Sequence, residues 1–241
     1  IYCRTIRDVI ELVSKGKVEK GIIPIENSIY GTVRETEDNL FRYHPRIAYS
    51  FTSKIHQNLV AKKDTDLKKI KIICSHQQAM EQCENFISKY LPEAEKMIFS
   101  STVQAMEYIA DSTENDIAAI GPIFAAREKD LKILKKNIED AKNNKTTFIV
   151  IQKEEIKPAK KHQKTGIVFW FGKDRPGTLH QVLGVFAQHK INLSKIESRP
   201  VPENPGEYLF FLDYDGDGKI LAKIKTMTAG LKSFGTYEFK S

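Results

Sequence analysis

Strand-like and helix-like segments alternate along residues 1–152, and this alternation constrains the fold of the chain more than any other feature. Short runs rich in β-branched residues end at glycine or polar residues, and the segments between them space their apolar residues at helical intervals. Such an order is typical of α/β sheets with parallel strands. We expect strands at residues 20–25, 46–53, 71–74, 95–100, 116–120 and 147–152, and helices at residues 6–15, from 33 onwards, 78–90 and 102–110.

A charged segment separates this pattern from a second one. Residues 153–164, KEEIKPAKKHQK, include a proline and show no apolar period, which is typical of a linker. Beyond it, Asp174 and Pro176 are expected to open a helix. The remaining expected elements are strands at residues 166–171, 191–197, 207–214 and 236–240, and a helix at 220–231. This β-α-β-β-α-β order is the ferredoxin-like motif, so we expect two domains, residues 1–152 and 165–241.

The composition excludes several classes of protein. Of the 241 residues, 41% are hydrophobic and 10% aromatic, which suits packed domains. No apolar stretch is long enough to cross a bilayer. The net charge is +7, but Lys and Glu are interspersed without a basic stripe, so neither a nucleic acid nor a membrane is an expected partner. Cys3, Cys74 and Cys83 match no metal pattern and His76 has no paired ligand, so we expect reduced thiols, no metal and a cytoplasmic location.

The stretch GIIPIENSIYGT carries polar groups at the end of an expected strand. Thr32 and Glu35 fit a capping box for the next helix, which would place Glu26, Asn27 and Ser28 between a strand end and a helix start. In open α/β sheets that crevice is a common ligand site. The alternative is that Asn27 and Ser28 only make the hydrogen bonds of a turn. Position alone leaves both interpretations open.

Seven short motifs make the pattern specific. They are Pro24-Ile25-Glu26-Asn27-Ser28 with Gly31, Ile55-His56-Gln57-Asn58-Leu59, Ser75-His76-Gln77-Gln78 with Gln82-Cys83, Ser101-Thr102 with Ala105, Asn144-Lys145-Thr146-Thr147-Phe148, Arg175-Pro176-Gly177-Thr178-Leu179, and Glu197-Ser198-Arg199-Pro200. In order and spacing they resemble the motifs of the prephenate dehydratase family over essentially the whole chain. The resemblance implies a bilobal catalytic domain of two α/β lobes, similar to periplasmic binding proteins, followed by a ferredoxin-like ACT regulatory domain.

The resemblance implies a reaction and a regulator. Members of the family convert prephenate to phenylpyruvate by decarboxylative dehydration, a step of phenylalanine biosynthesis, and phenylalanine bound to the ACT domain inhibits them. The substrate loses one carboxylate as carbon dioxide and one hydroxyl as water, and the ring becomes aromatic. The enzyme must hold two carboxylates and help a hydroxyl leave, so no cofactor is needed. A homodimer or homotetramer is expected.

The resemblance also assigns site residues. Thr146 is expected to donate a hydrogen bond to the departing hydroxyl, and Asn27, Ser75 and Gln82 are expected to orient the substrate. Further substrate-binding residues are expected to be Glu26, Ser28, Thr102 and Phe148. Phenylalanine is expected to bind, at a dimer interface, to Gly177, Thr178, Leu179, Glu197, Ser198, Arg199 and Pro200.

The sequence departs from the family pattern at three places. The family starts with a strand and a Gly-Thr-Phe-Ser loop, whereas this sequence starts at Ile1, already in the second strand, so we expect either a missing segment or an incomplete site. Thr147 stands where the family has Arg, and Lys145, Arg34 or a residue of the missing segment could supply that charge instead. Gln77 stands where the family has Pro, which loosens a turn.

Three alternative functions remain open at the level of sequence. Arogenate dehydratase performs the same chemistry on the amino analogue of prephenate, and these motifs do not distinguish the two substrates. A homologue that senses phenylalanine but catalyses poorly would fit the replacement at Thr147. A bilobal ligand-binding protein without catalysis would share the architecture. The retained Asn27, Ser75, Gln82 and Thr146 argue against this last alternative.

Overall fold

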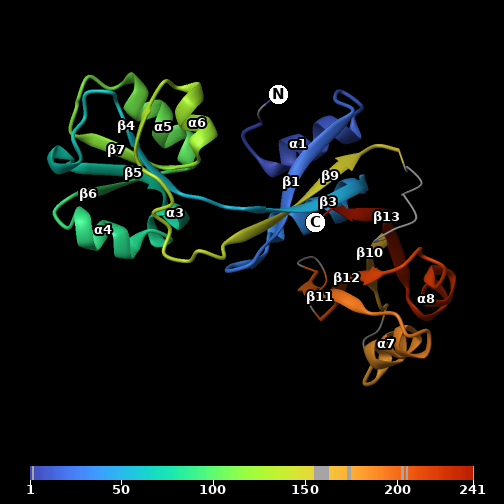
Figure 1. Ribbon diagram of the computed structural model, residues 1–241. Coiled ribbons are helices and arrows are strands. Elements are labelled where there is room, and N and C mark those ends of the chain that lie inside the picture. Colours follow the sequence, from blue (N-terminus) through green and yellow to red (C-terminus); the bar gives the residue numbers. More distant parts are fainter. Residues whose placement is uncertain (2, 155–162, 173–174, 202–203, 205, 241) are drawn as a thin grey trace. The chain divides into compact units, whose positions relative to one another are not determined.

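The computed structural model describes residues 1, 3–154, 163–172, 175–201, 204 and 206–240 (Figure 1). The chain forms two compact units: the first comprises residues 1–53 and 146–241, and the second comprises residues 54–145. Most of the expected linker, and the expected helix cap Asp174, lie outside the described residues.

One eight-stranded sheet, in the order β11-β12-β10-β13-β3-β9-β1-β2, runs through the first unit. Its amino-terminal part contains α1 (Ile6–Ser14), β1 (Lys20–Asn27), β2 (Gly31–Thr32), α2 (Arg34–Tyr43), β3 (Arg46–Lys54) and β9 (Lys145–Gln152). β1 pairs with both β2 and β9 in the antiparallel direction. The prediction of parallel strands is therefore wrong for this part, because β1 continues into a hairpin with β2 rather than into a crossover helix.

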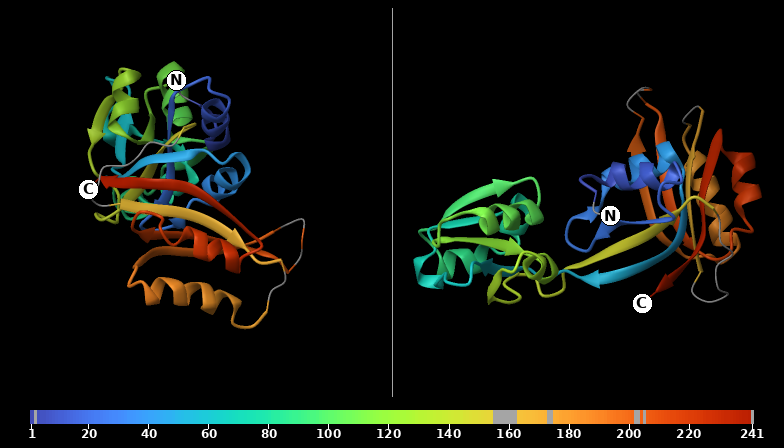
Figure 2. Two further views of the ribbon diagram at one scale, coloured as in Figure 1. Left: turned by 90° about the vertical axis from the view of Figure 1, so that its right-hand side faces the viewer. Right: turned by 90° about the horizontal axis from the view of Figure 1, so that it is seen from above.

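The carboxy-terminal part of the first unit contains β10 (Gln163–Trp170), α7 (Thr178–Gln188), β11 (Leu193–Pro200), β12 (Tyr208–Asp215), α8 (Leu221–Met227) and β13 (Gly230–Lys240). The predicted β-α-β-β-α-β order is confirmed, with α7 and α8 in contact on one face of the four strands (Figures 1 and 2). The last helix ends earlier than predicted and β13 begins at Gly230. A Cβ atom at Gly230 would lie 2.0 Å from the Trp170 ring, so only glycine fits where β13 starts beside β10.

β13 joins the two parts of the first unit into a continuous sheet. It pairs with β10 on one side and, in the parallel direction, with β3 on the other. The register on the β3 side places Glu238 opposite Tyr49 and Lys240 opposite Phe51. A single apolar core accompanies this junction and includes buried residues of both parts: Ile10, Val13, Ile23, Leu40, Ile149, Val168, Phe211 and Phe234.

The second unit is a five-stranded sheet in the order β6-β5-β7-β4-β8. Its elements are β4 (Asn58–Ala61), the 3-10 turn η1 (Leu67–Lys69), β5 (Ile72–His76), α3 (Gln77–Glu81), α4 (Glu84–Tyr90), β6 (Glu95–Phe99), α5 (Thr102–Asp111), β7 (Ile117–Gly121), α6 (Ile123–Glu128) and β8 (Lys132–Lys135). β5 is parallel to β6 and β7, as predicted, whereas β4 is antiparallel to β7 and β8. Two apolar clusters form the core of this unit.

Two local predictions for the second unit are corrected. The helix predicted at 78–90 is two helices, α3 and α4, because Cys83 leaves the helical conformation between them. The lysine-rich segment from Lys132, for which no strand was predicted, forms β8 with Ile133 and Leu134 partly buried. In the described part of the chain, we find no helix long and apolar enough to traverse a bilayer.

Candidate active site and regulatory site

Asn27 and Thr146 are paired across β1 and β9 of the first unit. The two residues are directly opposite in the sheet register. The Asn27 Nδ2 donates a hydrogen bond to the Thr146 Oγ1 at 2.9 Å, and the Asn27 Oδ1 accepts the N–H groups of Ile29 at 2.9 Å and Tyr30 at 3.2 Å. Since Thr146 accepts this bond through a lone pair, its own hydroxyl proton can be donated to another acceptor. Thr146 is 8% exposed, so few competing water molecules reach it.

The loop that carries Ser28 differs from its prediction. Glu26 and Asn27 are the last residues of β1, Ser28 begins a three-residue turn, and Thr32 lies in β2. The expected capping box does not form, because α2 begins at Arg34 with an N-cap that makes no side-chain hydrogen bond. Ser28 is therefore not at a helix start. The N–H groups of Ile29 and Tyr30, which follow Ser28, donate to the Asn27 Oδ1. The turn therefore fixes the orientation of the Asn27 amide.

The residues beside Thr146 on β9 contact β3. The Phe148 ring stacks on Phe51 with the ring centroids 5.6 Å apart. The Thr147 Oγ1 lies 3.2 Å from the Thr52 Oγ1, in hydrogen-bond distance, and Thr147 is opposite Glu26 in the register with β1. At the position where the family pattern has an arginine, the chain thus has a hydroxyl pair between β3 and β9.

The other expected substrate-orienting residues lie in the second unit. Gln82 follows the last residue of α3, and its Oε1 accepts a hydrogen bond from the Gln57 Nε2 at 3.0 Å. Ser75 lies in β5, is fully buried, and donates its hydroxyl to the Ile120 carbonyl of β7 at 2.7 Å. Thr102 is the first residue of α5. Among the described residues, no hydrogen bond joins Ser75 or Thr102 to Gln82.

The structure adds Glu139, which the sequence did not single out, to this group. Glu139 has a side chain only 4% exposed, and its carboxylate bonds the His56 Nδ1 at 2.7 Å and the Gln57 N–H at 2.9 Å. Gln57 in turn bonds Gln82. His56 and Gln57 lie in a motif that the sequence did identify, but no sequence spacing connects them to Glu139.

Cys74 and Cys83 are buried thiols of the second unit. Burial raises the pKa of the Cys74 thiol to about 11, and burial together with the carboxylates of Asp140 and Glu139 raises the pKa of the Cys83 thiol further. Such thiols are poor nucleophiles and poor metal ligands at neutral pH. All three cysteines are free, and the described residues contain no cluster of His, Cys, Asp and Glu that could hold a metal ion.

The expected regulatory residues of α7 line a hollow in the first unit. Its volume is about 350 Å³, within the range of small-molecule sites, and its lining residues are Arg175, Pro176, Gly177, Leu179 and Phe210. Gly177 precedes α7 with a φ of 89°, a left-handed conformation that favours glycine. The Thr178 hydroxyl donates a hydrogen bond to the Arg175 carbonyl. It therefore stabilises the loop that lines the hollow, but Thr178 is not itself a lining residue.

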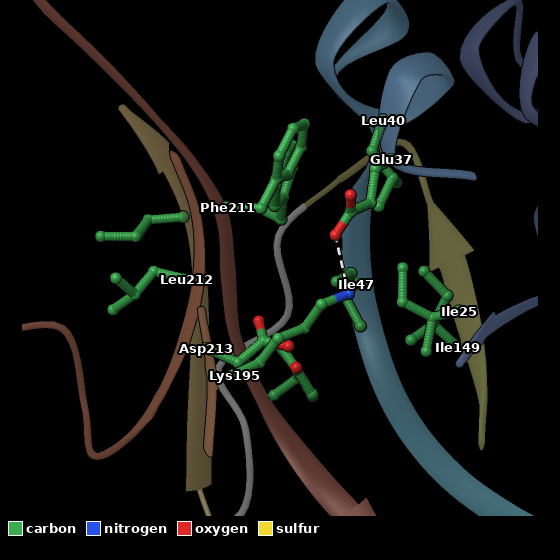
Figure 3. Close-up of a pocket in the computed structure, with 12 residues that line it drawn as sticks. Ile25, Glu37, Leu40, Ile47, Ile149, Lys195, Phe211, Leu212 and Asp213 are labelled. Carbon is green, nitrogen blue, oxygen red and sulfur yellow. Dashed lines mark ion pairs between the residues drawn. The ribbon is translucent and has the colours of Figure 1, made fainter. Parts of the chain in front are cut away.

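The other expected regulatory residues, from Glu197 to Pro200, lie in β11 at the edge of the sheet and do not line this hollow. The Arg199 Nη2 lies 3.1 Å from both carboxylate oxygens of Asp38 on α2. Four residues earlier on the same strand, the Lys195 Nζ lies 2.7 Å from the Glu37 Oε1 (Figure 3). β11 is thus attached by two consecutive ion pairs to the helix that follows the Asn27 turn.

Glu37 and Lys195 border a small cavity where α2 meets the sheet (Figure 3). Its volume of about 20 Å³ has room for one water molecule. Burial raises the pKa of the Glu37 carboxyl, and Lys195 opposes that effect. Burial also raises the pKa of Asp213, against the influence of Lys195, and raises the pKa of Tyr237, whose hydroxyl bonds Asp213. The Lys195 ammonium group therefore partly offsets the effect of burial on two carboxyl groups, those of Glu37 and Asp213.

Comparisons with known proteins agree with this arrangement. Residues 1–156 match the family model described as prephenate dehydratase, and residues 166–226 match the ACT domain model. A prephenate dehydratase of Methanocaldococcus jannaschii is 38% identical, over 98% of this chain and 86% of the relative. The crystal structure of an Arthrobacter aurescens prephenate dehydratase in complex with L-Phe has a TM-score of 0.89 at 30% identity and covers 99% of this chain and 81% of that one.

A third similarity shows what the fold alone can decide. A solved quorum-quenching acylase has a TM-score of 0.90 at 22% identity and covers 100% of this chain and 89% of that one. Because proteins with different activities share this fold, the assignment rests on the family models, the relative at 38% identity and the residues of the site. On these findings, the chain belongs to the prephenate dehydratase family and carries the family's ACT regulatory domain.

Proposed function

We propose that the protein converts prephenate to phenylpyruvate, carbon dioxide and water, and that phenylalanine bound to its ACT domain restrains the reaction. The observation that carries the proposal is the Asn27–Thr146 pair. Two residues 119 positions apart are joined so that an amide N–H occupies the threonine oxygen and leaves the hydroxyl proton as a donor. Membership of the family supplies the substrate class.

The reaction needs such a donor. The bond from the ring carbon to the hydroxyl oxygen breaks, the ring carboxylate leaves as carbon dioxide, and the electron pair of the broken carbon–carbon bond completes the aromatic ring. The departing oxygen keeps its proton and takes a second one from solvent. The Thr146 hydroxyl stabilises the negative charge that grows on this oxygen. A preorganised donor of this kind contributes about 3–4 kcal/mol to lowering the barrier.

The remaining residues hold the substrate or the elements that carry it. Asn27 positions Thr146, since both ends of its amide are bonded within the first unit. The Gln82 amide donates to a substrate carboxylate, and Ser75 supports the pairing of β5 with β7 in the second unit. In this proposal, further contacts to prephenate come from Glu26, Ser28, Thr102 and Phe148.

Phenylalanine fits the hollow beside α7. The lining combines backbone groups at Gly177, the apolar side chains of Leu179 and Phe210, and Arg175, which together suit a small apolar amino acid. The contribution of Thr178 is indirect, through the loop. Glu197 to Pro200 complete the site from a second chain in a homodimer or homotetramer, because they lie at the open edge strand β11. A cytoplasmic location agrees with the three free cysteines.

The test is phenylpyruvate formation from prephenate, and separately from arogenate, by the purified protein with and without phenylalanine. Turnover of prephenate that falls with phenylalanine supports both parts of the proposal. Thr146→Ala should lower kcat about 100- to 1000-fold, whereas Thr146→Ser, which keeps the hydroxyl, should retain most activity. Phenylalanine binding without any turnover would contradict the proposal and identify a sensor, and turnover of arogenate alone would change the substrate.

A further inference from the structure

Residues 138–140 connect the two segments of the second unit that carry Gln57 and Gln82. The Ile138 N–H donates to the Gln57 carbonyl at 2.8 Å, and the Asp140 N–H donates to the Gln82 carbonyl at 2.8 Å. Between these two residues in the sequence, Glu139 accepts the Gln57 N–H at 2.9 Å through a side chain that is 4% exposed. One short segment therefore fixes the backbone of both glutamines.

The side chains of the two glutamines are bonded in a defined direction. The Gln57 Nε2 donates to the Gln82 Oε1 at 3.0 Å. A primary amide has one acceptor oxygen and two N–H donors, so this bond occupies the oxygen of Gln82 and leaves its N–H groups. Within the described part of the chain, these N–H groups donate no hydrogen bond. A dianionic substrate needs donors of this kind.

The opposite direction is less favourable in the empty protein. Gln57 is 7% exposed, and its Oε1 is buried without a hydrogen-bond partner among the described residues. If both amides were reversed, the Gln82 Nε2 would donate to this oxygen, but the two N–H groups of Gln57 would then be buried without acceptors. Leaving one carbonyl oxygen unbonded is more common in proteins than leaving buried N–H groups unbonded.

We propose that Glu139 and Gln57 are positioning residues of the dehydration reaction, which set the Gln82 amide with its N–H groups toward a carboxylate of the substrate. The inference rests on the proposed function. Glu139 holds the backbone of Gln57, Gln57 holds the oxygen of Gln82, and Gln82 meets the anion. If Gln82 were reversed, its oxygen would face the substrate carboxylate and repel it.

Two substitutions of Gln57 distinguish its role in orienting the Gln82 amide from its contribution to packing. Gln57→Glu replaces the donor by a carboxylate that only accepts at neutral pH, so Gln82 must turn its N–H groups toward residue 57. Gln57→Met fills the space and leaves Gln82 free to turn either way. We expect kcat/KM for prephenate to fall about 2- to 10-fold in Gln57→Met and about 10- to 100-fold further in Gln57→Glu, mainly through KM.

Controls distinguish the direction of the amide from added charge and from misfolding. Gln77→Glu adds the same negative charge to the second unit, at a residue of α3 whose side chain bonds Glu81, and no hydrogen bond among the described residues joins it to the Gln82 amide. We expect this variant to keep kcat and KM near the wild-type values. Thermal unfolding of each variant checks the fold. Equal kinetics of Gln57→Glu and Gln57→Met, or an equal loss in Gln77→Glu, would overturn the inference.

A second variant keeps the inference testable if Gln57→Glu does not fold. Glu139→Gln has one acceptor oxygen for the two partners that Glu139 holds, His56 and the Gln57 N–H, so KM for prephenate should rise. Its matched control is Glu84→Gln, at an exposed ion pair with Lys96 in the same unit. Wild-type kcat and KM in Glu139→Gln would contradict the inference. Absence of turnover in the unmodified protein would refute the proposed function as well, which is a different result.

Discussion

At the residue scale, the candidate site depends on the direction in which side-chain amides are bonded. The sequence motifs identified Asn27 and Thr146, and the sheet register places them opposite each other. The motifs did not show that Asn27 is the donor of the bond between them, because that direction is fixed by the turn N–H groups bound to its oxygen. Glu139 was not predicted at all, since it acts on Gln57 from 82 positions away.

The role of Asn27 gives the first prediction. Asn27→Asp keeps the shape and can still accept the turn N–H groups, but it has no N–H for Thr146. The Thr146 hydroxyl would then donate to the aspartate instead of the departing oxygen, so kcat should fall about 100- to 1000-fold with little loss of thermal stability. Steady-state kinetics of the double variant with Thr146→Ala check the mechanism. Asn27 acts through Thr146, so the double variant should match Thr146→Ala alone, and additive losses would contradict this.

At the element scale, strands and helices were predicted correctly where the local residue pattern determines them. They were missed where hydrogen bonds to distant parts of the chain determine them. The β-α-β-β-α-β order followed from the apolar runs. The break between α3 and α4 did not, because it depends on the Gln82 carbonyl accepting the distant Asp140 N–H instead of a helical partner. The pairing of β13 with β3 was also missed, since no residue pattern in a strand says which edge it joins.

The attachment of β11 to α2 gives the second prediction. Lys195→Met would leave the Glu37 carboxyl, which is 1% exposed, without its ion-pair partner, and we expect a loss of about 3–5 kcal/mol in the free energy of unfolding. Lys195→Met combined with Glu37→Met should recover part of that loss, since Glu37 no longer carries an unpaired charge, whereas Asp213 still lacks the ammonium group of Lys195. Urea unfolding of the unmodified protein, Lys195→Met, Glu37→Met and the double variant measures these losses.

The exposed pair Lys71–Asp116 is the matched control for this cycle. The Lys71 side chain is 79% exposed, so Lys71→Met should change the free energy of unfolding by less than about 1 kcal/mol. If the losses of the two substitutions at Lys195 and Glu37 simply add, the two residues are not coupled and the pair does not join β11 to α2.

At the scale of the whole molecule, the buried carboxyls beneath α2 give stability a pH dependence. Burial raises the pKa of Asp213 from its ordinary 3.8, so the folded state binds this proton more tightly than the unfolded state. The stabilising contribution is complete below about 3.8 and is lost as pH rises through the higher pKa of the folded state. Asp213→Asn imitates the protonated form of Asp213. It should therefore remove the share of the stability loss at rising pH that comes from the ionisation of Asp213.

Urea midpoints between pH 4 and pH 8 check the third prediction. The midpoint of Asp213→Asn should fall less with rising pH than that of the unmodified protein. Asp217→Asn is the control, because the pKa of the exposed Asp217 is lowered by Lys219 and its contribution has the opposite sign. Parallel curves for the unmodified protein and Asp213→Asn would show that Asp213 does not titrate differently in the folded state.

The two ion pairs also give a physical route between the regulatory and catalytic parts of the first unit. β11 carries the Glu197 to Pro200 motif, α2 follows the turn held by Asn27, and Arg199 bonds Asp38 between them. Coupling between two binding sites is reciprocal, so phenylalanine and a substrate analogue should change each other's affinity by the same factor. Asp38→Asn weakens the connection without altering any residue proposed to bind phenylalanine.

We therefore expect Asp38→Asn to leave the affinity for phenylalanine alone nearly unchanged and to reduce the coupling factor about 2- to 5-fold, the loss of one partly exposed ion pair. Calorimetric titration of phenylalanine with and without saturating phenylpyruvate measures both quantities in each protein. A coupling factor equal to that of the unmodified protein would mean that the signal does not pass through Asp38 and Arg199. In that case the Lys195–Glu37 ion pair and the pairing of β3 with β13 are the connections to test next, and the β3–β13 pairing consists of backbone hydrogen bonds that a side-chain substitution does not remove.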